Sequence, residues 1–318
     1  MIPIVFSTDH TFIMPTGVAL FSMLDSAPGT EFDIFVLQAN DVTDSDRKLL
    51  IDMVAAYPSR ISFISMGRSF KGAFEIRNIS YASYFRLLIP WLIPRYDKIL
   101  YSDGDVIFCD NIQALYEEEL GDNYVGGFCP YASDNLSFSD YAPLLGLDAN
   151  EYINTGILLI NSKKQREDKL DTHYLELSKN KYRFQDQDII NIVCRHHIQA
   201  ISQRYNCDPG KWQLKDKCVI HYTGKKPWNT FTSSWTLWWN AYRRSPFYDA
   251  SFEQEVSDRI LHPRYSQKRI VSLFLDKNAP TLLSACRSIL NSNCVKKYLS
   301  GGGKIEFIPY APSYEMAA

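Results

Sequence analysis

Apolar and polar positions alternate along the chain in a pattern that predicts strands followed by helices. Short apolar runs bounded by polar residues predict strands at 2–7, 32–37, 61–66, 98–102, 124–128, 154–161 and 218–222. Apolar residues at helical spacing predict helices at 15–24, at 81–93 and at 185–194, the second of which is stopped by Pro94. A further helix is predicted to carry Leu49, Leu50, Met53 and Val54, with Thr43 and Asp44 as its cap. This alternation favours a parallel sheet covered by helices on both faces, with ligands at the carboxyl ends of its strands.

Length and charge narrow the classes of protein. A chain of 318 residues suggests one large α/β domain or about two ordinary ones. The formal net charge of -2 does not suggest a nucleic-acid-binding protein. The aromatic share of 14% is high and compatible with a protein that handles carbohydrates.

Cysteines and apolar stretches indicate where the protein works. The seven cysteines are scattered and form no Cys-x-x-Cys pair, which favours a reducing compartment over a disulfide framework. The N-terminus lacks the basic flank and long apolar run of a signal peptide. The most apolar stretch, 87–93, is interrupted by Pro90 and is too short to span a bilayer. We therefore expect a cytoplasmic protein.

The composition changes near residue 230, so we expect a domain over 1–230 and a smaller, basic and aromatic helical region over 231–318. Four of the six tryptophans lie between 228 and 239, and residues 259–304 hold nine Lys/Arg against one acidic residue. The basic stretch is either a solvated helical surface or a patch that rests on an anionic membrane as a peripheral contact, where each basic residue adds roughly 1 kcal/mol.

The strongest local motif is an apolar strand that runs into two acids, Ile99-Leu-Tyr-Ser-Asp103-Gly104-Asp105. Side chains two apart on an extended chain project to the same side, so both carboxylates can reach one cation. Gly104 removes the side chain between them and lets a ligand approach the backbone. These oxygen donors suit Mg²⁺ or Mn²⁺ carrying a phosphate. The alternatives are a polar turn and a phosphatase with an aspartyl nucleophile, whose Asp-x-Asp also follows a strand.

A second motif, His221-Tyr-Thr-Gly224-Lys-Lys226-Pro-Trp228, follows another short apolar run. An imidazole at a strand end is a candidate third metal ligand, and carboxylates with one nitrogen fit Mn²⁺ better than Mg²⁺. Gly224 permits close backbone approach, and Lys226 places a positive charge near any diphosphate. The alternative is a structural histidine.

Five segments in chain order carry a wider pattern: Phe6-Ser-Thr-Asp9; Ile79-Ser-x-x-Ser-Tyr-x-Arg86-Leu; Leu100-Tyr-Ser-Asp103-Gly-Asp105; Tyr152-Ile-Asn154-Thr-Gly with Gln185-Asp-Gln-Asp-Ile-Ile-Asn191; and His221-Tyr-x-Gly224-x-Lys226-Pro-Trp228. Together they resemble the family-8 retaining glycosyltransferases, which include bacterial lipooligosaccharide galactosyl- and glucosyltransferases and glycogenin. The resemblance covers roughly residues 1–245. It implies a Rossmann-like GT-A domain with a mixed central sheet, Mn²⁺ or Mg²⁺ as cofactor, and a UDP-hexose as donor.

The resemblance also implies roles for single residues. Asp103, Asp105 and His221 would hold the cation, and Gly224 and Lys226 the diphosphate. At the base, the resemblance implies contacts from Asp9 at the uracil edge, from Thr11 beside it and from Phe12. Near the ribose and the sugar it implies Arg86, Asp103 and Gly104. In the sugar pocket it implies Asn154, Asp186 and Gln187. Two departures from the family pattern are His10-Thr11 in place of Asp-Asn, and Asn78 in place of a histidine found in some galactosyltransferases. The second leaves the choice of hexose and acceptor open.

Three residues are candidates for the chemistry of retention: Asp186, Gln187 and Asp188. Gln187 is a poor nucleophile, whereas either aspartate is chemically better but faces another side of the helix. We favour front-face attack, in which Gln187 stabilises and positions. The expected reaction moves glucose or galactose to a hydroxyl of a glycan or glycolipid acceptor in a bacterial surface-polysaccharide pathway. The alternatives are the phosphatase and a non-catalytic sugar-nucleotide-binding protein.

Most of these residues also have a structural alternative. Arg86 could be a buried ion-pair partner, and Asn154 could bond only to the local backbone. Asp186 and Asp188 could be acids that stabilise the start of a helix. Asp9 could be a turn residue and Phe12 a core residue.

Overall fold

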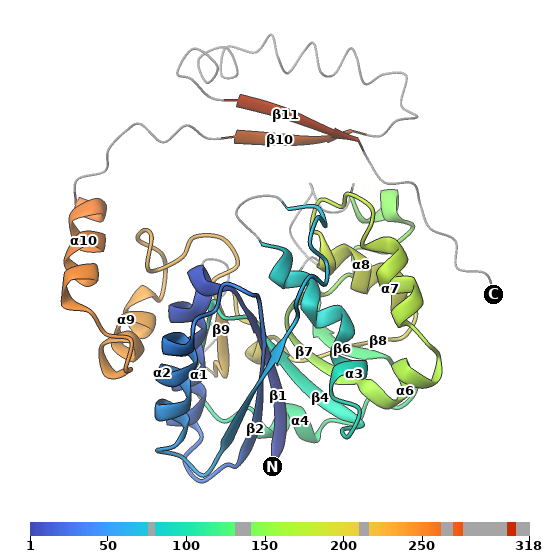
Figure 1. The fold of residues 1–318 in the computed structure, drawn as a ribbon. Helices are drawn as coiled ribbons and strands as arrows, with labels where there is room; N and C mark the ends of the chain where they lie inside the picture. Colours follow the sequence, from blue (N-terminus) through green and yellow to red (C-terminus); the bar gives the residue numbers. More distant parts are fainter. Residues whose placement is uncertain (76–79, 131–140, 210–215, 262–269, 276–303, 310–318) are drawn as a thin grey trace.

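A central sheet of seven strands lies between two layers of helices (Figure 1). The computed structural model describes residues 1–75, 80–130, 141–209, 216–261, 270–275 and 304–309. The strand order is β3-β2-β1-β4-β7-β6-β8. The strands are β1 (Ile2–Thr8), β2 (Phe32–Gln38), β3 (Arg60–Ser65), β4 (Lys98–Ser102), β6 (Val125–Phe128), β7 (Asn154–Asn161) and β8 (Ile198–Ala200).

The strand directions confirm the mixed sheet that the resemblance implies, and they correct the parallel sheet that the alternation of strands and helices predicted. β1 is parallel to β2 and β4, whereas β7 runs antiparallel to both of its neighbours, β4 and β6. The start of β7 therefore lies beside the end of β4. Ser102 pairs with Ile157, and the Asp103 amide donates to the Gly156 carbonyl at 2.8 Å. Two segments that sequence analysis assigned to one site thus meet at one sheet edge.

The two faces of the sheet carry separate hydrophobic clusters because successive strand side chains point to opposite sides. In β1, Ile4 and Phe6 pack on the side of helices α1 (Ile13–Ser26), α2 (Asp44–Val54) and α9 (Trp235–Arg244), and Val5 packs on the other side. That other side is covered by the 3₁₀ helix η2 (Tyr81–Leu88) and by α3 (Ile89–Leu92), α6 (Ser162–Glu167), α7 (Asp171–Leu177) and α8 (Asp186–Val193). The remaining helices of the main body are η1 (His10–Phe12), α4 (Gln113–Glu117), η3 (Ala142–Leu145) and η4 (Gln203–Tyr205).

The helix predicted over 81–93 is instead two elements, η2 and α3. Ser80 caps η2 by accepting from the Ala82 amide, and Pro90 lies in the first turn of α3. Proline lacks an amide hydrogen and is tolerated only in the first turn of an α-helix, so one continuous helix through this position is unfavourable. The predicted cap of α2 is confirmed at Thr43, which forms a reciprocal capping box with Asp46, whereas Asp44 is the first residue of the helix.

The strand predicted at 218–222 is β9 (Val219–His221), and it pairs outside the central sheet. Its antiparallel partner is β5 (Val106–Phe108), a strand that the sequence analysis missed. Val106 pairs with His221, so Asp105, the residue before β5, lies next to the end of β9.

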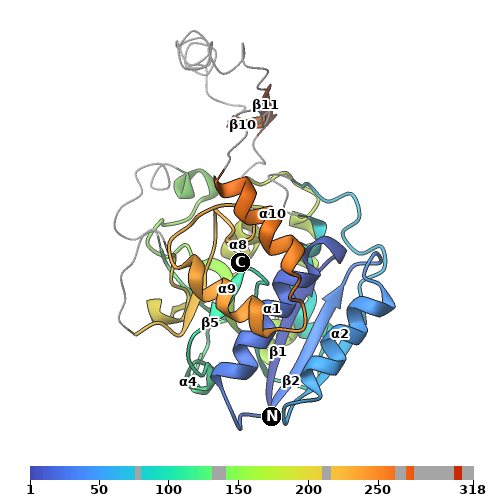
Figure 2. The same ribbon diagram turned by 90° about the vertical axis from the view of Figure 1, so that its left-hand side faces the viewer.

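The region after residue 230 begins as predicted with helices, α9 and α10 (Ala250–Leu261), which lie on the side that faces the viewer in Figure 2. Of the two, α9 packs against α1. Trp238, Trp239 and Tyr242 of α9 are buried in the same cluster as α1, so the boundary at 230 stays a prediction based on composition. Two unpredicted strands, β10 (Ile270–Leu275) and β11 (Lys304–Pro309), pair in parallel. The rest of the basic stretch and of the tail lies outside the described residues. Among the residues that the structure describes, no helix has the length and hydropathy to span a membrane.

Candidate metal and sugar-nucleotide site

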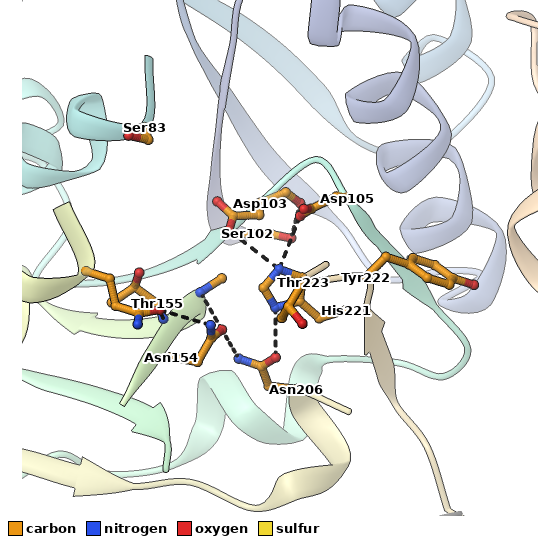
Figure 3. A network of polar contacts seen from close by, with 12 residues as sticks. Ser83, Ser102, Asp103, Asp105, Asn154, Thr155, Asn206, His221, Tyr222 and Thr223 are labelled. Atoms are coloured by element: carbon orange, nitrogen blue, oxygen red, sulfur yellow. Dashed lines mark hydrogen bonds and ion pairs between the residues drawn. The ribbon is translucent and has the colours of Figure 1, made fainter. Parts of the chain in front are cut away.

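Asp103, Asp105 and His221 meet at the carboxyl edge of β4. One ligand atom from each residue lies within 4.8 Å of the others. His221 Nε2 is 3.2 Å from Asp105 Oδ1 and 3.7 Å from Asp103 Oδ2 (Figure 3). The β5–β9 pairing produces this meeting, because it places the end of β9 opposite the residue that follows Asp105. The three residues predicted as metal ligands are therefore together.

Gly156 makes room for the imidazole. A Cβ atom on Gly156 would lie 2.0 Å from His221 Cε1, closer than any non-bonded contact allows. His221 is 3% exposed and fits there only because β7 carries glycine at this position. The Asn-Thr-Gly segment at the start of β7 thus has a structural role that sequence analysis did not assign.

Hydrogen bonds from the backbone determine which nitrogen of His221 carries the proton. The Gly156 amide can only donate, and it donates to Asn154 Oδ1 at 3.0 Å. Asn206 Nδ2 donates to the same oxygen at 2.9 Å, which turns Asn206 Oδ1 toward His221 Nδ1 at 3.0 Å (Figure 3). Nδ1 must therefore donate, and in the neutral imidazole Nε2 then presents its lone pair to the two carboxylates.

This arrangement fits a divalent cation. With the imidazole neutral, its Nε2 lone pair faces the buried Asp105 Oδ1 at 3.2 Å. Two acceptors that face each other in a buried site repel unless a cation lies between them. Two carboxylates and one imidazole are ligands that suit Mn²⁺ and are compatible with Mg²⁺.

Lys226 adds positive charge at the same place. Its ammonium pairs with Asp105 Oδ2 and donates to the Tyr222 carbonyl at 2.5 Å. Burial alone raises the pKa of Asp105, but Lys226 and His221 together outweigh burial, and the pKa lies well below its usual range. Asp105 is therefore ionised at neutral pH.

Asn206 was missed by the sequence analysis, and it yields a first prediction. We expect Asn206→Ala to weaken Mn²⁺ binding by about 10- to 100-fold, because His221 loses the bond that orients its ring. Titration calorimetry measures this affinity. Asn123→Ala is the control, since the Asn123 side chain donates to the Leu120 carbonyl at 3.0 Å, a partner outside the metal cluster. Equal affinities in both variants would contradict the orienting role.

Arg86 links the cluster to helix α8. It lies in η2, its side chain is 6% exposed, and it pairs with Asp103 at 2.7 Å and with Asp186 at 2.9 Å. It also donates to the Thr155 carbonyl at 2.7 Å and lies over the Tyr101 ring at 4.4 Å. Burial raises the pKa of Asp186 to about 6 despite the guanidinium. Arg86 is thus the buried ion-pair partner that sequence analysis weighed as an alternative, and it also lies against a predicted metal ligand.

Gln187 lies beside the start of β7. Its Oε1 accepts from Asn154 Nδ2 at 3.0 Å and from the Thr155 amide at 3.4 Å. Its Nε2 donates to the Tyr152 hydroxyl at 3.1 Å. The bond between Asn154 and Gln187 joins two residues that the resemblance assigned to one sugar pocket.

Asp188 points elsewhere. It is fully buried, and its oxygens accept from the hydroxyls of Tyr141 and Tyr152 and from the Phe184 amide at 2.7 Å. Burial raises the pKa of Asp188 to about 7, although these hydrogen bonds oppose the shift. Asp186, two positions earlier, faces Arg86 instead. The two acids that flank Gln187 therefore have different surroundings.

The predicted base contacts lie at the end of β1. Asp9 Oδ1 accepts from the Phe12 amide at 2.9 Å and from the Thr11 hydroxyl at 2.7 Å, so it caps η1. The Phe12 ring packs edge-on against Trp228 with centroids 5.8 Å apart, which joins the two loops of the site. Asn78 lies outside the described residues.

The two glycines of the site differ in what requires them. A Cβ atom on Gly104 would lie 2.4 Å from Thr16 Oγ1, so packing against α1 already requires glycine there. A Cβ atom on Gly224 would meet nothing within 4 Å, so the Gly224 backbone is open to approach.

Known proteins are similar to this chain in sequence and in fold. The model of "Glycosyl transferase family 8" matches residues 3–232. A putative glycosyltransferase of Haemophilus influenzae is 27% identical over 236 residues, which cover 70% of this chain and 71% of the relative. The lipopolysaccharide 1,2-glucosyltransferase of Escherichia coli is 24% identical over 294 residues, which cover 84% of this chain and 86% of the relative.

The crystal structure of the galactosyltransferase LgtC with donor and acceptor sugar analogues is similar at a TM-score of 0.68 and 26% identity, covering 80% of this chain and 100% of that one. This likeness confirms the expected GT-A type of fold. The family match extends over every predicted metal and donor-binding residue from Asp9 to Lys226. The chain therefore belongs to glycosyl transferase family 8.

Proposed function

We propose that the enzyme transfers glucose or galactose from a UDP-sugar to a hydroxyl of a glycan or glycolipid acceptor, with retention and with Mn²⁺ or Mg²⁺ held by Asp103, Asp105 and His221. The observation that carries the proposal is the meeting of these three side chains within 4.8 Å. Membership of a glycosyltransferase family sets aside the phosphatase and the non-catalytic protein.

The main barrier is charge separation, because the diphosphate leaves as positive charge develops on the sugar ring. A bound cation supplies positive charge to both phosphates. Lys226 supplies a second positive charge, and its bond to the Tyr222 carbonyl holds the ammonium beside Asp103, Asp105 and His221. Preorganised charges of this kind are each worth about 10²- to 10³-fold in rate. Gly224 lets the backbone of the same loop approach the diphosphate.

Retention proceeds in this proposal by front-face attack, without a carboxylate nucleophile. Support comes from the surroundings of the two acids: Asp186 is paired with Arg86, and Asp188 is bonded to two tyrosines. A covalent intermediate would need a carboxylate free to reach the anomeric carbon. Gln187 then stabilises and positions the donor sugar.

The donor base, the acceptor and the location complete the proposal. Asp9, Thr11 and Phe12 bind the uracil and ribose, and Arg86 and Asn154 orient the sugar. Among the named relatives, one is a glucosyltransferase and one a galactosyltransferase, so the proposal includes both UDP-glucose and UDP-galactose as donors. A surface glycan such as lipopolysaccharide is the acceptor class, and the enzyme works in the cytoplasm with peripheral contact to the membrane.

A panel of UDP-hexoses tests this function. We expect UDP-glucose or UDP-galactose to raise the unfolding temperature in the presence of Mn²⁺, and slow UDP release to stop on addition of EDTA, because the diphosphate needs the cation. The control is UDP-N-acetylglucosamine, whose larger 2-substituent distinguishes pocket selectivity from UDP binding alone. Absence of UDP release from every donor with Mn²⁺ would refute the proposal.

A further inference from the structure

The orientation of the Gln187 amide is determined by its neighbours. The Thr155 backbone amide can only donate, so the atom that faces it at 3.4 Å must be the oxygen of Gln187. Asn154 Nδ2 donates to the same oxygen at 3.0 Å, and the Gly156 amide in turn fixes the orientation of Asn154. Both lone pairs of Gln187 Oε1 are therefore engaged.

The opposite side of the amide is held by Tyr152. Gln187 Nε2 donates to the Tyr152 hydroxyl at 3.1 Å, so that oxygen acts as an acceptor and its own proton must go elsewhere. It goes to Asp188 Oδ1. Tyr152 is 1% exposed and Asp188 fully buried, so water does not substitute for this pair.

In its ionised form, Asp188 is an acceptor on both oxygens. Besides Tyr152, the Tyr141 hydroxyl and the Phe184 amide donate to Oδ2. Three donors that converge on one buried carboxylate hold it as a fixed acceptor, and it in turn fixes the direction of the Tyr152 hydroxyl.

We propose that Tyr152, oriented by Asp188, is a positioning residue that fixes how the Gln187 amide is presented to the donor sugar: the amide nitrogen turns toward Tyr152 and the amide oxygen toward Asn154. The inference rests on the proposed function, in which Gln187 lies against that sugar. The amide oxygen, which accepts from Asn154 and Thr155, lies on the side of the predicted sugar pocket, and the Tyr152 hydroxyl holds the nitrogen on the buried side.

Tyr152→Phe tests the proposal because it removes one hydroxyl and keeps the ring. Tyr141→Phe is the matched control. It also removes a hydroxyl that donates to Asp188, but the hydroxyl that accepts from Gln187 belongs to Tyr152 and stays in place. The first readout needs no donor: the side-chain amide resonances of Gln187 in ¹⁵N-glutamine-labelled protein, assigned by their loss in Gln187→Ala. We expect Tyr152→Phe to speed solvent exchange of these protons by about 3- to 10-fold, the worth of one hydrogen bond, and Tyr141→Phe to leave them near wild type.

The second readout is kinetic. We expect Tyr152→Phe to lower kcat by about 10-fold at unchanged KM for the donor, because a misdirected amide still permits donor binding through the diphosphate. In the Gln187→Ala background the same substitution should have no further effect, since the side chain that it positions is absent. Tyr141→Phe should leave kcat near wild type in both backgrounds.

The outcomes separate the two proposals. Unchanged amide exchange in Tyr152→Phe, or equal effects of the two tyrosine variants, would overturn the positioning role. If wild-type protein transfers no sugar from any UDP-hexose, the proposed function fails while the amide readout still decides the orientation of Gln187. A wild-type measurement is independent of how the variants fold: nuclear Overhauser contacts between the Gln187 amide protons and the Tyr152 ring are expected, and their absence counts against the proposal.

Discussion

Asp105→Asn is expected to lower the metal-dependent rate of sugar transfer by about 1,000-fold or more. Asparagine has the same shape but no charge, and one of its two terminal atoms becomes an NH₂ group. That group would face either the Lys226 ammonium or the His221 Nε2 atom, both of which now meet carboxylate oxygens. The measurement is the initial rate of UDP-sugar turnover across a Mn²⁺ titration.

Asp110→Asn is the matched control. Asp110 is close in the sequence, but its side chain is 54% exposed and pairs with Arg204 at 2.9 Å, away from the cluster. We expect its rate and its Mn²⁺ requirement to match wild type. If Asp105→Asn kept the wild-type rate at the same Mn²⁺ concentration, Asp105 would not be a metal ligand and the proposed site would fail.

Arg86→Met is expected to have the largest effect on stability, a loss of about 3–5 kcal/mol in the free energy of unfolding. The substitution leaves Asp103 and Asp186 without the buried guanidinium that lies 2.7 Å and 2.9 Å from them. Activity should fall with it, because Asp103 also loses the partner that orients it. Urea unfolding at pH 7 measures the stability term.

The loss caused by Arg86→Met should depend on pH. The pKa of Asp186 is about 6 in the folded protein against an ordinary 3.8, so its buried charge costs stability above pH 6, and this cost disappears as the pH falls from 6 toward 4. Removing the guanidinium raises this pKa further. The difference between variant and wild type should therefore be larger at pH 8 than at pH 5.

Arg244→Met is the control for Arg86→Met. Arg244 is 60% exposed and pairs with the partly exposed Asp25, so its loss should cost less than about 1 kcal/mol at either pH. Equal losses in the two variants would show that Arg86 contributes no more than a surface ion pair.

Local sequence patterns were sufficient for much of the fold. The seven-residue strands β1 and β2 are buried throughout and consist mostly of apolar residues, and the cap at Thr43 is a contact between residues three apart. These signals are readable because each depends on neighbours along the chain. The split of 81–93 at Pro90 could have been read from the same kind of signal, since the missing amide is itself a local property.

The sequence by itself determined which residues could carry the chemistry: an acid pair at spacing two after a buried strand, and a histidine loop with glycine and lysine. Only the tertiary structure decided how they act together. The β5–β9 pairing brings Asp105 beside His221 across more than a hundred residues, and Asn206 orients that histidine from a short loop without periodicity. Asp186 and Asp188 look equivalent in the sequence, yet one faces Arg86 and the other two buried tyrosines. The reason is physical: hydrogen-bond direction depends on three-dimensional neighbours, and residues two apart on a helix face different ones.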